Sequence, residues 1–258
     1  MNSIEQQIWG FTPEGEAVVR YTMTNAGGAS VVLSNIGAGI IAVNVPDRNG
    51  KLANVALGYD RFESYFGDGP YMGKTPGRFA NRIGEGRFTL DGKEYRLAQN
   101  SGGQHLHGGL KGFANKVWTG RVETDRVVFS LVSPDGDDKY PGEVTVEVCY
   151  DWNDDCELEI TYYAKTDAPT IINLTNHSYF NLKGESAGRA MEQELQLNAS
   201  KFLWYDKNCI PTGELVEVKG TPMDFTTAKA LARDIDAYYE PLNIGHGYDQ
   251  SWAIDGYE

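Results

Sequence analysis

The stretch "TIINLTNHSYFNL", residues 170–182, carries many hydrogen-bonding side chains beside a hydrophobic run. Ile171, Ile172 and Leu174 predict the start of a strand, but amides, hydroxyls and His177 follow them. Buried polar groups cost free energy unless each finds a partner. This stretch is therefore either a solvated edge or the floor of a polar pocket. Histidine, with a reference pKa of about 6.5, can give and retake a proton near neutrality.

Two more of the four histidines lie in "NSGGQHLHGGLKGF", where glycine pairs allow a close backbone approach or a positive φ. His105 and His107 are two residues apart, so in a strand both would face the same side. This is also a metal-ligand spacing, which His177 or Asp249 could complete. No His-x-x-x-His or cysteine cluster accompanies it, so a metal site is the weaker interpretation. No G-x-S-x-G nucleophile motif and no phosphate-binding glycine loop is present.

The stretches "TPGRFANRIGEGRF" and "GYDQSW" supply further polar groups. Arg78, Asn81 and Arg82 bring forked donors and an amide close together, and arginine suits the binding of several oxygens at fixed geometry. Paired arginines also form structural ion pairs, so that alternative stays open. Asp249 could accept hydrogen bonds from hydroxyls. With Tyr179 and other aromatic rings nearby in sequence, these groups indicate a carbohydrate pocket.

The elements that must position these residues are mostly strands, because the dominant hydrophobic period is two. Gly27-Gly28 and Asp91-Gly92 predict tight hairpin turns, and Glu123-Thr124-Asp125 divides a third pair of strands. In 143–152 and 156–166 the apolar residues alternate cleanly. Residues 192–204 and residues 213–220 continue the alternation, and each stretch is expected to form a strand. The pattern predicts an all-β protein, a sandwich or barrel with one domain over 1–258.

Only two stretches have helical spacing. Residues 58–66, "GYDRFESYF", place Phe62 and Phe66 four apart and predict a short helix. Residues 226–241, "TTAKALARDIDAYYEP", place Leu231, Ile235 and Tyr238 on one face and predict a helix that stops at Pro241.

The composition of the chain argues against some classes of binding partner. The net charge of −13 argues against nucleic-acid binding, which needs a basic surface, and gives no attraction to anionic membranes. The N-terminus has no signal-peptide pattern and no run approaches 18 apolar residues, so a cytoplasmic protein is expected. Cys149, Cys156 and Cys209 are expected to be reduced, although a disulfide between the first two is conceivable across a hairpin.

Four motifs in this order resemble the aldose 1-epimerase, or galactose mutarotase, family: "GRFANRIGEGRFTLDGKEYRL", "HLHGGLKGF", "NLTNHSYFNL" and "GYDQ". The resemblance covers nearly the whole chain from about Leu33. It implies a large antiparallel β-sandwich (a galactose mutarotase-like supersandwich), a sugar in a cleft on one face, and no metal or organic cofactor. It also implies interconversion of the α and β anomers of a free hexose such as galactose or glucose.

The resemblance assigns roles to residues. His177 would be the general acid at the ring oxygen, and His107 would help to bind or polarise that oxygen. The remaining substrate-binding residues that it implies are Asn81, Arg82, Ser178, Tyr179 and Asp249. From composition we further expect Asn173, Thr175 and Asn176 to hold the His177 ring.

The family's general base is a glutamate well beyond the "GYD" motif, in a segment that this sequence lacks. The sequence ends at Glu258, nine residues after Asp249, so neither Asp255 nor Glu258 matches that glutamate. Several last strands would be missing too. The expectation is therefore a mutarotase whose sequence is incomplete or whose tail, with the base, comes from elsewhere. The alternatives are a catalytically silent sugar-binding sandwich and a metal-dependent enzyme using His105, His107 and His177.

Overall fold

The computed structural model describes residues 3–257, so Glu258 lies outside the described residues. The chain divides into two compact units, Met1–Ala187 and Gly188–Glu258. The single domain expected over 1–258 stays a prediction. Within residues 3–257, no helix has the length and apolar character needed to cross a membrane.

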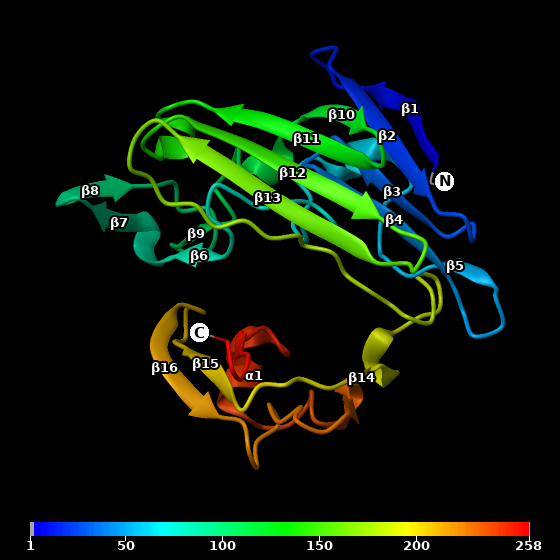
Figure 1. The fold of residues 1–258 in the computed structure, drawn as a ribbon. Coiled ribbons are helices and arrows are strands. Elements are labelled where there is room, and N and C mark those ends of the chain that lie inside the picture. The colour runs from blue at the N-terminus through cyan, green and yellow to red at the C-terminus, as the bar shows by residue number, and fades with distance from the viewer. Residues whose placement is uncertain (1–2, 258) are drawn as a thin grey trace. The chain divides into compact units, whose positions relative to one another are not determined.

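The first unit contains two antiparallel sheets that lie against each other (Figure 1). The five-stranded sheet has the order β1(Ser3–Phe11), β2(Ala17–Thr24), β3(Ser30–Ser34), β4(Gly39–Pro46) and β5(Leu52–Asn54). The four-stranded sheet has the order β10(Thr119–Glu123), β11(Arg126–Ser133), β12(Val144–Trp152) and β13(Leu158–Thr166). The expected all-β, antiparallel architecture is thus confirmed.

The space between these sheets is the main hydrophobic core. Val144, Val146 and Val148 of β12 share one face and are essentially excluded from solvent, as the alternation of the sequence predicts. They pack in one cluster with Leu33 of β3 and Phe129 of β11. Full burial of such side chains contributes about 1.5–3 kcal/mol each, so the period of two fixes which face of each strand points inward.

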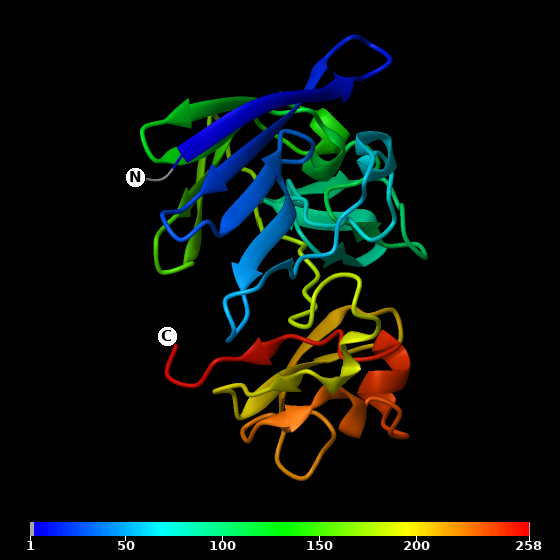
Figure 2. The same ribbon diagram turned by 90° about the vertical axis from the view of Figure 1, so that its right-hand side faces the viewer.

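Short elements join the two large sheets. They include two small antiparallel pairs, β6(Arg82–Ile83) with β9(His105–Leu106) and β7(Arg87–Leu90) with β8(Lys93–Arg96). Four 3₁₀ helices accompany them: η1(Phe62–Tyr65), η2(Gly84–Gly86), η3(Phe113–Asn115) and η4(Asp137–Lys139). The segment that follows β5, drawn in cyan, lies on one side of strands β1–β5 in Figure 2.

The hairpin predictions are confirmed. Asp91 (φ 50°) and Gly92 (φ 76°) form the turn between β7 and β8, with the positive φ that a two-residue hairpin requires. Gly28 (φ 81°) lies in the turn between β2 and β3. The helix expected in 58–66 is present as the single 3₁₀ turn η1.

The second unit consists of short strands around a small core. Its elements are β14(Glu194–Leu195), β15(Lys201–Tyr205), β16(Pro211–Glu217), β17(Lys229–Ala230), β18(Trp252–Ala253), η5(Ala190–Glu192), η6(Leu231–Arg233) and α1(Glu240–Gly245). The strands pair in the orders β14-β17 and β16-β15-β18. Phe202, Met223 and Leu242 are buried together in this unit.

The helix predicted over 226–241 is wrong. Lys229 and Ala230 instead form β17 and pair with Leu195 and Glu194 of β14, which removes these residues from any helix. Pro241 does not end a helix but lies in the first turn of α1, where its missing N–H costs nothing.

Candidate active site

His177 is carried by an extended segment that is pinned to the chain before β6. The His177 N–H donates to the carbonyl of Lys74 (2.9 Å), and the Gly73 N–H donates to the carbonyl of His177 (3.0 Å). The Asn176 side chain donates to the Gly73 carbonyl (2.8 Å), while its Oδ1 accepts from the Ser178 N–H (3.0 Å). The strand expected at the start of this stretch is reduced to isolated bridges, one of them between Asn173 and Phe79.

The expected role of the neighbouring amides needs correction. Asn173 Nδ2 donates to the carbonyl of Ala80 (3.2 Å), and Asn176 binds the backbone as described. These amides therefore hold the main chain around His177 and not its ring.

His107 is held at the end of β9 by reciprocal contacts with Asn81. The His107 N–H donates to the Asn81 carbonyl (3.1 Å), and the Asn81 N–H donates to Nδ1 of His107 (3.0 Å). Because Nδ1 accepts a hydrogen bond, the proton of the neutral ring sits on Nε2. Gly108 follows with φ 85°, and a Cβ at that position would lie 1.6 Å from the carbonyl oxygen of Gly77. Only glycine permits this approach of the two segments.

The two imidazoles meet edge to face. The ring centroids of His107 and His177 are 5.1 Å apart at an interplanar angle of 89°. The Tyr71 ring packs against both imidazoles, with its centroid 4.7 Å from that of His107 and 6.0 Å from that of His177. The Tyr179 ring packs against His177 with a distance of 5.2 Å between the ring centroids, and the Tyr179 hydroxyl donates to the Pro70 carbonyl (3.0 Å). Two proton-carrying rings are thus framed by two aromatic side chains.

His107 is electrostatically biased towards the neutral form. Burial, together with smaller contributions from the nearby His177 and from the guanidinium of Arg82, lowers its pKa to about 4. At neutral pH the ring therefore carries one proton, on Nε2, where it can donate a hydrogen bond. His107 is thereby suited to polarising an oxygen rather than to transferring a proton at pH 7.

Asn81 and Arg82 join the same group. Asn81 has φ 68°, and its Oδ1 accepts from the N–H of Arg82 (2.8 Å) and from its Nη1 (3.5 Å). Arg82 is half-buried at the start of β6, opposite Leu106 in the register with β9. Ser178 lies next to His177 with its Oγ buried and without a hydrogen-bond partner among residues 3–257. The structure therefore brings together the predicted Asn81, Arg82, His107, His177, Ser178 and Tyr179.

Asp249 and Arg78 are two further residues that the sequence singles out. Asp249 belongs to the second unit, where its N–H donates to the carbonyl of Gly247 (3.1 Å). Arg78 is not a ligand-binding arginine: its side chain is buried and donates to the carbonyls of Ser133, Pro134, Pro141 and Gly142 at 2.7–3.0 Å. It is a structural residue without a carboxylate partner at ion-pair distance within residues 3–257.

His105 is also structural. It is completely buried, its Nδ1 donates to the Ala98 carbonyl (2.8 Å), and the Tyr140 hydroxyl donates to its Nε2 (2.6 Å). The prediction that His105 and His107 face the same side is wrong, because β9 ends at Leu106 and His107 turns to φ 51°. Among the residues that the structure describes, no group of three or more His, Cys, Asp or Glu side chains is placed to hold a metal.

Tyr71 is the residue near the histidines that the sequence arguments missed. It lies in "GDGPYMGKTPG", which has no hydrophobic period. Glycines and prolines at this density predict an irregular loop, where functional residues concentrate, and that is the signal that could have pointed to it.

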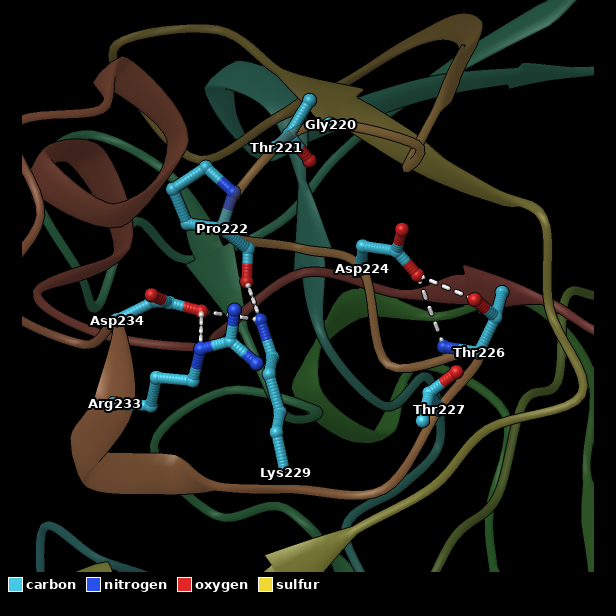
Figure 3. Close-up of a pocket in the computed structure, with 9 residues that line it drawn as sticks. All are labelled: Gly220, Thr221, Pro222, Asp224, Thr226, Thr227, Lys229, Arg233 and Asp234. Atoms are coloured by element: carbon cyan, nitrogen blue, oxygen red, sulfur yellow. Dashed lines mark hydrogen bonds and ion pairs between the residues drawn. The ribbon is translucent and has the colours of Figure 1, made fainter.

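The second unit contains a separate cavity of about 430 Å³ (Figure 3). Lys229 projects into it, but its Nζ donates to the Pro222 carbonyl (2.6 Å) and pairs with Asp234 (2.7 Å). The ammonium group also lies 4.3 Å from the centroid of the Phe225 ring. Its charge is engaged in structural contacts, and we assign no ligand to this cavity.

Comparison with known proteins shows the family of this chain. The model of the aldose 1-epimerase family matches residues 19–256, and the chain belongs to this family. The chain is 40% identical over 256 residues to galactose mutarotase of Bos taurus, with 99% of this chain and 73% of that protein covered. It is 35% identical to aldose 1-epimerase of Escherichia coli (strain K12), with 94% and 70% covered.

Solved structures agree with this assignment. The fold matches the crystal structure of galactose 1-epimerase from Lactobacillus acidophilus with a TM-score of 0.88 and 27% identity, covering all of this chain and 76% of that one. A homologue of aldose epimerase from C. elegans matches with a TM-score of 0.78 and 30% identity, covering 91% and 67%. The expected galactose mutarotase-like sandwich is thereby confirmed.

Proposed function

We propose that this chain interconverts the α and β anomers of a free aldohexose such as galactose or glucose, as an aldose 1-epimerase. Membership of the family and the names of the relatives support this isomerase activity. The observation that carries the proposal is the pair of imidazoles, 5.1 Å apart, of which His107 is kept neutral.

The reaction requires opposite proton movements at two oxygens. The C1 hydroxyl passes its proton to a general base, the ring oxygen gains a proton from an acid, and the bond between C1 and the ring oxygen breaks to give the open-chain aldehyde. Neither histidine is assigned as this base; the family resemblance assigns it to a glutamate that no residue of this sequence matches. Rotation about C1–C2 and the reverse steps close the ring with the other configuration. In this scheme His177 is the acid that protonates the ring oxygen and recovers the proton on closure. His107 donates a hydrogen bond from Nε2 to the same oxygen and stabilises the charge that develops there.

Binding of the sugar is assigned to groups around this pair. Arg82 and Asn81 would bind sugar hydroxyls through their guanidinium and amide groups, together with Ser178. Asp249, which lies in the second unit, stays a predicted hydroxyl acceptor from its sequence motif. The exposed part of Tyr179 would cover an apolar C–H face of the ring. No metal or organic cofactor takes part in this proposal.

Polarimetry of freshly dissolved α-galactose tests the proposal. The chain should accelerate equilibration in proportion to its concentration, and the rate should be unaffected by a chelator. Isothermal titration with galactose is the companion measurement. Binding without acceleration would overturn the enzymatic proposal in favour of a catalytically silent sugar-binding protein, and activity lost to the chelator would favour a metal-dependent enzyme.

We also propose that the protein works in the cytoplasm, without nucleic-acid or membrane partners. All three cysteines are free, which suits a reducing compartment. The net charge of −13 favours neither nucleic acid nor anionic lipid.

A further inference from the structure

The ring of His177 is held by packing. Among residues 3–257 no hydrogen bond reaches either of its ring nitrogens, and its ring contacts are those with Tyr71, His107 and Tyr179. His107, by contrast, has a backbone N–H fixed on Nδ1. A general acid must keep its donor nitrogen aimed at one oxygen, so the groups that orient the His177 ring matter for the chemical step.

Tyr71 is the side chain that joins the two histidines. Its ring packs against His107 at an interplanar angle of 65° and against His177 at an interplanar angle of 37°. Tyr71 adopts φ 54°, a left-handed conformation that is unfavourable for a residue with a bulky side chain. The surrounding loop must therefore stabilise this conformation.

The support for this conformation is a buried ion pair under the loop. Lys74 is completely excluded from solvent and pairs with Asp68, whose side chain is 3% exposed. Lys74 Nζ also donates to the carbonyl of Tyr65 (2.5 Å) and lies 5.8 Å from the Tyr71 ring centroid. The other carboxylate oxygen of Asp68 accepts from the N–H of Met72 (2.8 Å). The ion pair thus links Asp68 and Lys74, the first and last residues of the turn that carries Tyr71.

The same lysine is linked to His177 through the main chain. The carbonyl of Lys74 accepts from the His177 N–H, and the Gly73 N–H donates to the His177 carbonyl. The turn of residues 68–74 therefore fixes His177 twice, by its backbone through Gly73 and Lys74 and by its ring through Tyr71.

We propose that Tyr71 is a positioning residue for the His107–His177 pair, and that the buried Asp68–Lys74 ion pair holds it in place. This inference deepens the proposed epimerase function and rests on it for its kinetic consequences. Tyr71 makes no proton transfer itself; it restricts the His177 ring to orientations in which a nitrogen can reach the ring oxygen of the sugar.

The test compares Tyr71→Leu, Tyr71→Phe and Tyr95→Leu. Tyr95 stacks on Phe88 in the β7–β8 hairpin and provides a matched tyrosine-to-leucine control. Tyr71→Leu should lower kcat on the order of tenfold or more and leave KM within about twofold, because it loosens the acid without removing a hydroxyl-binding group. Tyr71→Phe restores the ring and should recover kcat to within about threefold of the wild type. Tyr95→Leu should keep the kcat of the wild type.

Imidazole NMR supplies a readout that needs no turnover. The ring-proton resonances of His107 and His177 should move in Tyr71→Leu and stay in place in Tyr95→Leu. If these resonances do not move, or if Tyr71→Leu keeps the kcat of the wild type, the positioning role is refuted. If the wild type itself is inactive, the proposed function fails while the NMR comparison still decides whether Tyr71 orients the rings.

The ion pair is tested with the double variant Asp68→Asn/Lys74→Met. Removing one partner of a buried pair leaves an unpaired charge and can unfold the chain, whereas replacing both is often tolerated. The double variant should fold and show the same direction of change in kcat and in the His177 resonances as Tyr71→Leu. Wild-type kcat and unchanged resonances in the folded double variant would refute the supporting role.

Discussion

The His107 ring should remain neutral at pH values well below the ordinary pKa of histidine. The perturbation is a change of pH from about 7.5 to about 4. Burial, with smaller contributions from His177 and Arg82, lowers the His107 pKa from 6.5 to about 4 in the folded chain. In the unfolded chain this ring is solvated and titrates near its ordinary value.

The sign and size of the effect follow from this difference. Between the two pKa values the unfolded state binds more protons than the folded state, so the free energy of unfolding falls as the pH falls from about 6.5 towards 4. Lowering an imidazole pKa from 6.5 to about 4 corresponds to about 3 kcal/mol. The variant His107→Gln cannot titrate, although its amide oxygen can still accept from the Asn81 N–H. The wild type should therefore lose about 3 kcal/mol more stability than His107→Gln over this range.

Urea denaturation of both proteins at the two pH values measures this difference. A ¹H–¹⁵N correlation spectrum of the imidazoles, simplified by a total of four histidines, gives the tautomer and the titration midpoint directly. Titration of His107 near pH 6.5, or a proton found on Nδ1 at neutral pH, would refute the assignment of His107 as a neutral Nε2–H donor.

Three further substitutions test other parts of the account. Arg78→Met should lower the free energy of unfolding by about 4 kcal/mol or more in urea, because four carbonyls lose their donor, among them those of the buried Ser133 and Gly142; a loss below about 1 kcal/mol would contradict the structural role. Gly108→Ala should abolish activity and lower the melting temperature, since its Cβ would overlap the Gly77 carbonyl, and a fully active variant would be inconsistent with this packing. Arg82→Ala should weaken galactose binding in calorimetry about tenfold or more, whereas Arg96→Ala, an exposed arginine of β8, should not; equal affinities would make Arg82 a structural residue.

Strand pairing could be predicted from the sequence because two local signals agree. Alternation along 143–152 and 156–166 specifies the buried face, and Asp91-Gly92 specifies a turn with positive φ. The predicted helix over 226–241 shows the limit of such signals. Leu231 and Ile235 have helical spacing, but the pairing of β17 with β14 is a non-local contact that the period does not encode.

The histidine pair could be located from motifs, but the sequence could not tell which of two similar residues is structural and which belongs to the site. Arg78 and Arg82 lie four residues apart with the same side chain, and their different burial separates a structural residue from a candidate ligand. His105 and His107 differ in the same way, through the end of β9. Tyr71 depends on the fold of an irregular loop, for which the sequence contains no periodic signal.

The most direct test of the central claim is the rate of exchange between the α and β anomers of galactose at equilibrium, measured by two-dimensional exchange NMR for the wild type and His177→Ala. Loss of the acid should lower the catalysed rate by about 10²–10⁴. Added imidazole should restore part of this rate beyond its own effect on the free sugar, because the ring can enter the vacated space. A folded His177→Ala variant that exchanges the anomers as fast as the wild type would contradict the account.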